Sequence, residues 1–169
     1  MSLPKVLLVD DRRDSLVALA AILQGLPVEP VPVDSGTAAL KQLLIDDFAV
    51  ILMDAQMPQM DGFETASRIK ERERTRNVPI IFLTAADRDA QLALRGYAAG
   101  AVDYLTKPLD PWVLRAKVSV FAELWTKTRQ VAELKTMTAA CRDALGALDA
   151  GDAETAAGLL RKALADHQS

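Results

Sequence analysis

Short apolar runs alternate with amphipathic stretches through the first three-quarters of the chain, and this alternation limits the possible folds more than any other feature. Five runs have the length and composition of strands, at residues 6–9, 28–33, 50–53, 80–83 and 102–105. The stretches between them, at 16–23, 37–45, 63–73 and 88–98, space their apolar residues along one helical face. Strands alternating with helices predict an α/β fold, with a parallel sheet covered on both faces. Pro30 and Pro32 place the second strand at a sheet edge.

The pattern changes after Pro111. The spacing predicts one long helix from Trp112 to about Ala150, a break at Gly151, and a short helix with Asp152 as its N-cap. Within the long helix, two lines of residues recur every seven positions, as in the seam of a coiled coil. One line contains Leu124, Val131, Thr138 and Leu145, and the other contains Lys127, Leu134, Cys141 and Leu148.

Charge and composition exclude several classes of function. The net charge of −3 at pH 7 gives no electrostatic reason to expect nucleic acid or an anionic membrane as a partner. Cys141 is the only cysteine and His167 the only histidine, which excludes thiolate metal cages, most zinc sites and histidine-based triads. No apolar run approaches the ~18 residues of a membrane span, and no secretory signal precedes the first strand, so we expect a cytoplasmic protein.

Polar residues stand at the ends of the predicted strands, where the apolar pattern does not require them. The carboxyl ends of parallel strands meet at one edge of a sheet, which is where ligands bind in open α/β folds. These residues should therefore converge in space although they are far apart in the sequence. They are Asp10 and Asp11 after the first strand, Asp54 after the third, Thr84 after the fourth, and Thr106, Lys107 and Pro108 after the fifth.

This combination of side chains predicts phosphoryl chemistry with a bound metal ion. Three neighbouring carboxylates repel one another unless a cation neutralises them, and oxygen ligands without histidine or cysteine favour Mg²⁺. A carboxylate beside Mg²⁺ can attack phosphorus, which makes Asp54 the candidate phosphoacceptor. Lys107 and Thr84 would stabilise the charge of the transferred group, and Pro108 is a candidate for a cis peptide bond.

Four segments resemble the receiver domain of two-component response regulators: VLLVDD, ILMDAQMPQMDGFE, PIIFLTA and GAVDYLTKPLD. The resemblance covers residues 5 to 125. It implies a doubly wound, flavodoxin-like sheet of order 2-1-3-4-5, an order known for this family. We therefore divide the chain into a receiver domain at 1–125 and a helical tail at 126–169. The tail matches no output domain that we can name.

The resemblance also implies roles for individual residues. Asp54 would accept the phosphoryl group, and Thr84 and Lys107 would bind it. Mg²⁺ would be held by Asp11, Asp54 and the backbone carbonyl of Gln56, with Asp10 acting through water. Tyr104 would be an aromatic switch. The side chains of Gln56 and Ala86 stand where the family tunes the lifetime of the phosphorylated state.

The function implied is a signalling switch that is phosphorylated by a histidine kinase, a phosphotransfer protein or a small phosphodonor, and that is not an enzyme acting on other substrates. One alternative is a phosphatase of the haloacid-dehalogenase type, although Gln56 stands where such enzymes need a second carboxylate. A second is an adaptor whose acidic cluster has lost its chemistry. A third is a receiver fragment of a larger sensor protein.

The seam of the long helix predicts a homodimer through the tail. Residues 152–166 form at most ~22 Å of helix, whereas Leu124 to Leu148 span roughly 36 Å. The short helix therefore cannot cover the whole seam, and part of it must meet another chain, the receiver or water. In a parallel dimer the two Cys141 side chains would face each other. The alternative is a tail that folds back as an intramolecular hairpin.

Overall fold

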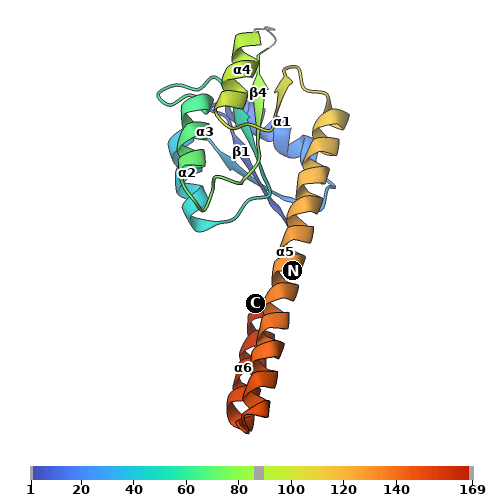
Figure 1. Cartoon of the computed structure of the whole chain (residues 1–169). Coiled ribbons are helices and arrows are strands. Elements are labelled where there is room, and N and C mark those ends of the chain that lie inside the picture. Colours follow the sequence, from blue (N-terminus) through green and yellow to red (C-terminus); the bar gives the residue numbers. More distant parts are fainter. Residues whose placement is uncertain (1, 86–89, 168–169) are drawn as a thin grey trace. The chain divides into compact units, whose positions relative to one another are not determined.

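The structure, a computed structural model, describes residues 2–85 and 90–167. The chain divides into two compact units, Met1–Leu124 and Trp125–Ser169. Strands and helices alternate in the first unit (Figure 1). Along the chain, the elements are β1 (Lys5–Val9), α1 (Arg13–Leu23), β2 (Glu29–Val33), α2 (Gly36–Ile45), β3 (Val50–Asp54), α3 (Gly62–Glu71), β4 (Ile80–Thr84), α4 (Ala90–Ala98), β5 (Asp103–Thr106), α5 (Pro111–Asp149) and α6 (Ala153–His167).

The five strands form one parallel sheet of order β2-β1-β3-β4-β5, which confirms the predicted fold and topology. The strand with two prolines, β2, lies at the sheet edge as predicted, because proline cannot donate a ladder hydrogen bond. The central strands β1, β3 and β4 are almost wholly buried. Such strands read as continuous apolar runs because both of their faces are covered.

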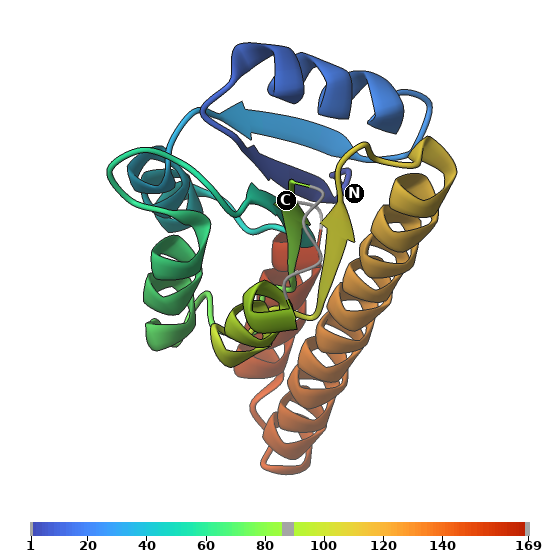
Figure 2. The ribbon, with the colours of Figure 1, turned by 90° about the horizontal axis from the view of Figure 1, so that it is seen from above.

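Helices cover the sheet in two layers, and each layer encloses its own apolar core (Figure 2). Alternate residues of β1 and β3 point to opposite faces, so Leu7 and Ile51 belong to the core under α2 and α3. Their neighbours Leu8 and Leu52 belong to the core under α1 and the first part of α5. Both layers therefore hold β1 and β3 in place, and these are the strands whose ends carry the acidic residues.

Side-chain caps fix where several helices begin and end. Asp61 is the N-cap of α3, and its side chain accepts a hydrogen bond from the N–H of Glu64 at 2.8 Å. Near the start of α5, the side chain of Arg115 donates to the backbone carbonyl oxygens of Ile22 (2.6 Å) and Gln24 (2.8 Å). These carbonyls lie at the end of α1, whose last turn contains no basic residue of its own.

In the second unit, α6 folds back along the end of α5 (Figure 1). The turn contains Gly151 at a positive φ of 83°, a conformation that favours glycine. The N–H of Asp152 donates to the carbonyl of Ala147, and its carboxylate accepts from the N–H of Thr155 at 3.0 Å. Both the predicted break at Gly151 and the N-cap at Asp152 are confirmed. No described helix is both long enough and apolar enough to cross a membrane.

Close packing at the start of α3 leads to a stability prediction. A Cβ atom on Gly62 would lie 2.3 Å from the carbonyl oxygen of Asp54 and 3.0 Å from the Cα of Ala55. We expect Gly62→Ala to lower the free energy of unfolding by about 1–3 kcal/mol, because backbone must shift to make room. Chemical denaturation followed by circular dichroism measures this change.

Gly146→Ala is the matched control, because nothing lies within 4 Å of the Cβ position at that helical glycine. It should leave stability unchanged or raise it by up to about 1 kcal/mol. If the two variants behave alike, close packing against the end of β3 is not what requires glycine at position 62.

Candidate functional site

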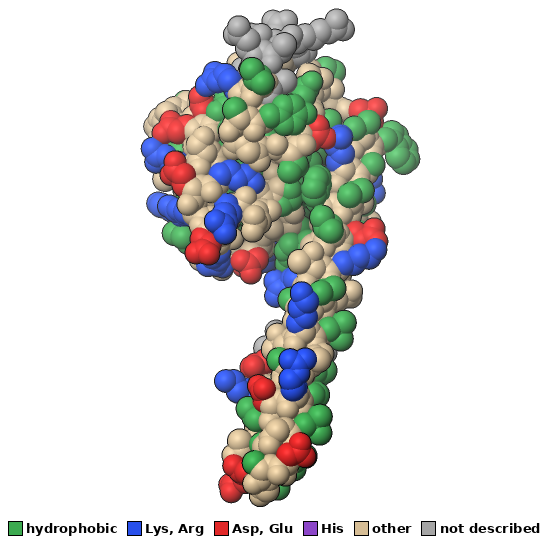
Figure 3. Space-filling model, viewed as in Figure 1, with side chains coloured by type: hydrophobic (Ala, Val, Ile, Leu, Met, Phe, Trp, Pro, Cys, Tyr) green, Lys and Arg blue, Asp and Glu red, His purple; other side chains and the backbone are tan. Residues whose placement is uncertain are grey.

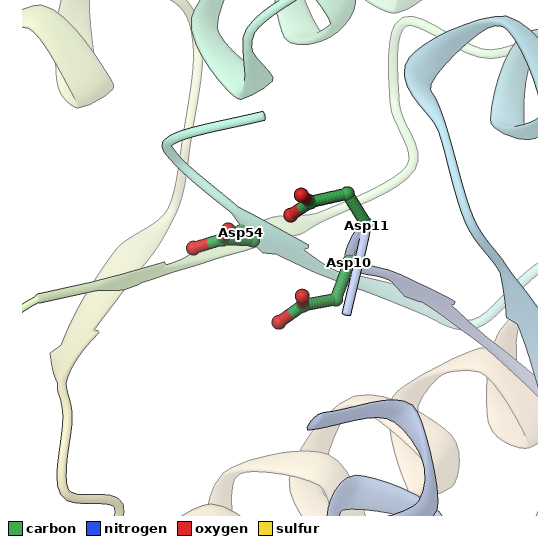
Figure 4. A group of neighbouring side chains, drawn as sticks. All are labelled: Asp10, Asp11 and Asp54. Carbon is green, nitrogen blue, oxygen red and sulfur yellow. The ribbon is translucent and has the colours of Figure 1, made fainter. Parts of the chain in front are cut away.

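The parallel register brings three carboxylates together at the carboxyl edge of the sheet. Val9 pairs with Met53 across β1 and β3, so the residues that follow them, Asp10 and Asp54, stand side by side. Asp11 is the next residue along the chain. Figure 4 shows the three carboxylates turned toward the same side. One oxygen of each lies within 4.8 Å of one oxygen of the other two. Asp10 is fully buried and Asp54 is 8% exposed, whereas Asp11 is open to solvent.

The ammonium group of Lys107 lies between two of these carboxylates. It donates to Oδ2 of Asp10 at 3.1 Å and to Oδ1 of Asp54 at 3.4 Å. Lys107 follows β5, two strands away from β3, so this contact exists only once the sheet has formed. The Lys107–Pro108 peptide bond is cis.

The other predicted site residues lie around this cluster. Thr84 is the last residue of β4 and is 7% exposed, one position beyond the partner of Asp54 in the strand register. Gln56 is exposed in the loop after β3. Tyr104 on β5 is 41% exposed and lies edge-on to the ring of Tyr97, with 6.1 Å between ring centroids. Ala86 lies outside the residues that the structure describes.

Burial raises the pKa of Asp54 above its ordinary value, and the neighbouring charge of Asp10 acts in the same direction. The charge and hydrogen bond of Lys107, together with the backbone N–H of Gln56, oppose this rise. Because the pKa stays raised, the charge and hydrogen bond of Lys107 do not fully offset the effect of burial on the Asp54 carboxylate. An additional cation would favour the ionised form of Asp54.

The donor set fits a hard divalent ion. Three carboxylates within 4.8 Å offer only oxygen ligands, and the exposed side of Asp11 leaves room for water. Mg²⁺ prefers one or two carboxylates together with retained water molecules. Asp10, Asp11 and Asp54 are the residues that would hold it.

A mostly apolar hollow of about 290 Å³ adjoins the acidic cluster. Asp10 and Lys107 form part of its wall, so it opens beside the groups that would handle a phosphoryl group. The other residues that line it come from α1 and from the segment after β5: Ser15, Ala18, Leu19, Ile22, Pro108 and Leu109.

Two features of the site were not predicted from the sequence. The backbone N–H of Arg12 donates to Oδ1 of Asp10 at 2.9 Å, which fixes one oxygen of that carboxylate. This is a local Asx-type contact, and its sequence signal is an aspartate at a point where the chain reverses direction. Gly62 allows α3 to approach the backbone of Asp54 closely, and its only sequence signal is a glycine directly after an N-cap aspartate.

The raised pKa of Asp54 predicts how stability depends on pH without metal. In the folded protein the ionised carboxylate is disfavoured, so it lowers stability at pH values above its folded pKa. This effect disappears below about pH 4, where the carboxyl is protonated in both states. Asp54→Asn should therefore be more thermostable than the parent at pH 7 in chelator, and the difference should vanish as the pH falls below that point.

Thermal unfolding followed by circular dichroism measures this difference, and Asp47→Asn is the control because Asp47 is exposed and pairs with Arg74. Equal melting temperatures of parent and Asp54→Asn at pH 7 would contradict the account of the pKa.

Comparison with known proteins identifies the family. A family model described as the response regulator receiver domain matches residues 6–119. The chain is 35% identical over 114 residues to response regulator PleD of Caulobacter vibrioides, covering 68% of this chain and 25% of PleD. It is 37% identical over 111 residues to sensor histidine kinase GacS of Pseudomonas protegens, covering 63% of this chain and 12% of GacS. The chain thus spans a quarter or less of the length of these relatives.

A solved structure agrees with this result. Chemotaxis response regulator CheY4 of Vibrio cholerae superimposes with a TM-score of 0.65 at 28% sequence identity, covering 70% of this chain and 98% of CheY4. The family model matches well over half of the chain, over the region that contains the sheet and the acidic cluster. The chain therefore belongs to the response regulator receiver domain family, whose members are phosphorylation-controlled signalling modules.

Proposed function

We propose that Asp54 is the phosphoacceptor of this receiver and that Asp10, Asp11 and Asp54 hold its Mg²⁺. The observation that carries this proposal is the position of Lys107, which contacts both Asp10 and Asp54 where three carboxylates converge. Receiver domains bind Mg²⁺ at an acidic pocket of this kind. When bound, the ion would neutralise charge on the carboxylates and on the transferred phosphoryl group.

The chemistry is the transfer of a phosphoryl group to a carboxylate oxygen. An oxygen of Asp54 attacks phosphorus and forms the P–O bond of an acyl phosphate, while the P–N bond of a donor phosphohistidine breaks. The histidine nitrogen leaves with the electron pair of that bond. Lys107 and Thr84 act on the oxygens of the transferred group, Lys107 by charge and Thr84 through its hydroxyl.

The donor in this proposal is a histidine kinase or a phosphotransfer protein. The apolar hollow beside Asp10 and Lys107 gives such a protein a surface to contact close to the acceptor. The phosphatase hypothesis has less support, because Gln56 supplies an amide where that class needs a carboxylate.

The helical tail is the part of the chain that would pass the signal on. We assign the receiver to residues 1–125 and a helical tail to 126–169, and we propose that the tails pair in a homodimer. The exposed apolar residues of α5 support this pairing: Val131, Leu134, Leu145 and Leu148 are each at least half exposed. Tyr104, on the exposed face of β5, is the proposed aromatic switch.

The first test is chemical. After treatment with acetyl phosphate and Mg²⁺, intact-mass measurement should show one added phosphoryl group in the parent protein and in Asp47→Asn. Asp54→Asn and the parent in excess chelator should show none, because the acceptor or the cation is missing. Undiminished labelling of Asp54→Asn would refute the assignment.

The second test concerns how long the phosphoryl group persists. Hydrolysis needs a water molecule held in line with phosphorus, and neither the amide of Gln56 nor the methyl group of Ala86 can act as a base. We expect slow loss of phosphate from the purified protein, and faster loss from Ala86→Glu. Loss within seconds in the parent, or an unchanged rate in the variant, would contradict this prediction.

A further inference from the structure

The tail helix α5 has two apolar faces of different character, and the helical hairpin covers only one of them. The covered face consists of small or flexible residues at heptad spacing, namely Met137, Ala140, Ala144 and Ala147, which are buried or half-buried. Ala144 and, on α6, Ala156 are each 2% exposed. Small side chains of this kind allow two helices to lie close together. We call this set the alanine face.

The second face carries larger side chains and lies in water. Val131, Leu134, Leu145 and Leu148 are 50–64% exposed, and Cys141 is also exposed. These residues occupy the two seven-residue lines of the coiled-coil seam, together with Thr138. We call this set the leucine stripe. Figure 3 shows hydrophobic side chains gathered along one side of the tail.

We infer that two copies of the hairpin join through the leucine stripe and form a parallel four-helix bundle, an inference that rests on the proposed pairing of the tails. Within each chain, the alanine face of α5 holds α6. Between chains, the leucine stripe of one α5 packs against the same stripe of the other. The hairpin thus supplies two of the four helices, and a bundle of four has enough apolar surface for a common core.

The residues of the stripe favour a second copy of this helix over an unrelated partner. Knobs-into-holes packing needs apolar side chains every three and four positions on both helices, and a helix with that spacing supplies it to a copy of itself. Val131 on one line and Leu134 and Leu148 on the other match the arrangement that favours two-stranded pairing. Helix α6 adds Leu160 and Leu164, one turn apart and 38% and 52% exposed.

Charge favours the parallel orientation. An antiparallel pairing that overlaps the whole stripe would place Val131 opposite the second copy's Leu148. The positions flanking the stripe would then bring Lys135 near the second copy's Arg142, so like charges would face each other. In the parallel pairing, the flanking contacts of Lys135 and Arg142 are with Gln130 and Met137 of the second copy, and neither carries a charge.

Thr138 sets an upper limit on the strength of the pairing. Its hydroxyl donates to the carbonyl of Leu134 at 2.7 Å, so it is satisfied within the helix but places a polar atom in the stripe. Lys127 occupies an equivalent position nearer the receiver. A stripe with such interruptions gives a dimer that exchanges with monomer, rather than a permanent one.

Sedimentation velocity of the full chain tests the inference at tens of micromolar. The parent should be a dimer. Leu134→Gln with Leu145→Gln should raise the dissociation constant about a hundredfold, because four apolar side chains leave each dimer. Thr136→Gln with Asp143→Gln is the matched control, since both residues are exposed and lie off the leucine stripe. Thr138→Val should tighten the dimer about tenfold, a gain that misfolding cannot produce.

Orientation is tested with Leu148→Cys in a Cys141→Ser background. In the parallel bundle the two new thiols face each other and form an interchain disulfide with a mild oxidant. In the antiparallel pairing they lie roughly 25 Å apart, too far for a disulfide. A dimer without this crosslink would overturn the parallel bundle.

The remaining outcomes distinguish a failure of the tail pairing from a failure of the leucine stripe as its contact surface. A parent chain that is monomeric throughout would refute the tail pairing itself, and the bundle with it. A dimer that survives the double glutamine change would refute only the role of the leucine stripe. Labelling of Asp54 by acetyl phosphate in the same variants is unaffected by either result, so the phosphoacceptor assignment stands or falls separately.

Discussion

The ammonium group of Lys107 lies between Asp10 and Asp54, and the chemistry proposed for the receiver depends on this shared contact. Three carboxylates lie together at one edge of the sheet. The pKa of Asp54 is raised because the effect of its burial is larger than the opposing effect of the Lys107 charge. With three carboxylates and one ammonium group, the ionised cluster is two positive charges short of balance. In the proposed function, a divalent cation would restore that balance and a phosphoryl group would upset it again, so occupancy of the site would bias neighbouring structure.

The fold tolerates this unbalanced edge because the strands that carry it are held from both sides. Every residue of β3 is buried, and β1 and β3 contribute to both apolar cores. Gly62 brings α3 against the backbone of Asp54, and the N–H of Arg12 fixes Asp10. Buried central strands place the carboxylates, while the proposed phosphate-binding and switch residues, Lys107 and Tyr104, stand on or after the outer strand β5.

The sequence patterns were sufficient to predict the helices and strands and the sheet edge at which the acidic residues meet. Continuous apolar runs predicted buried parallel strands, and parallel strands bring their carboxyl ends to one edge, so Asp10, Asp11 and Asp54 had to converge. The sheet order came from family resemblance. Contacts between distant segments carry no local signal, which is why the cap that Arg115 gives to α1 was not predicted. In the tail, large apolar residues marked the seam, but α6 packs on alanines, which the pattern did not single out.

The central claim is that the carboxylate cluster needs a cation that Lys107 alone does not replace. Calorimetric titration of Mg²⁺ into the metal-free protein tests it most directly, with Asp11→Asn and the exposed control Asp14→Asn measured beside the parent. The account predicts one bound ion per chain in the parent and in Asp14→Asn, and binding weakened at least about tenfold in Asp11→Asn. Equal Mg²⁺ affinity in Asp11→Asn and the parent would contradict it.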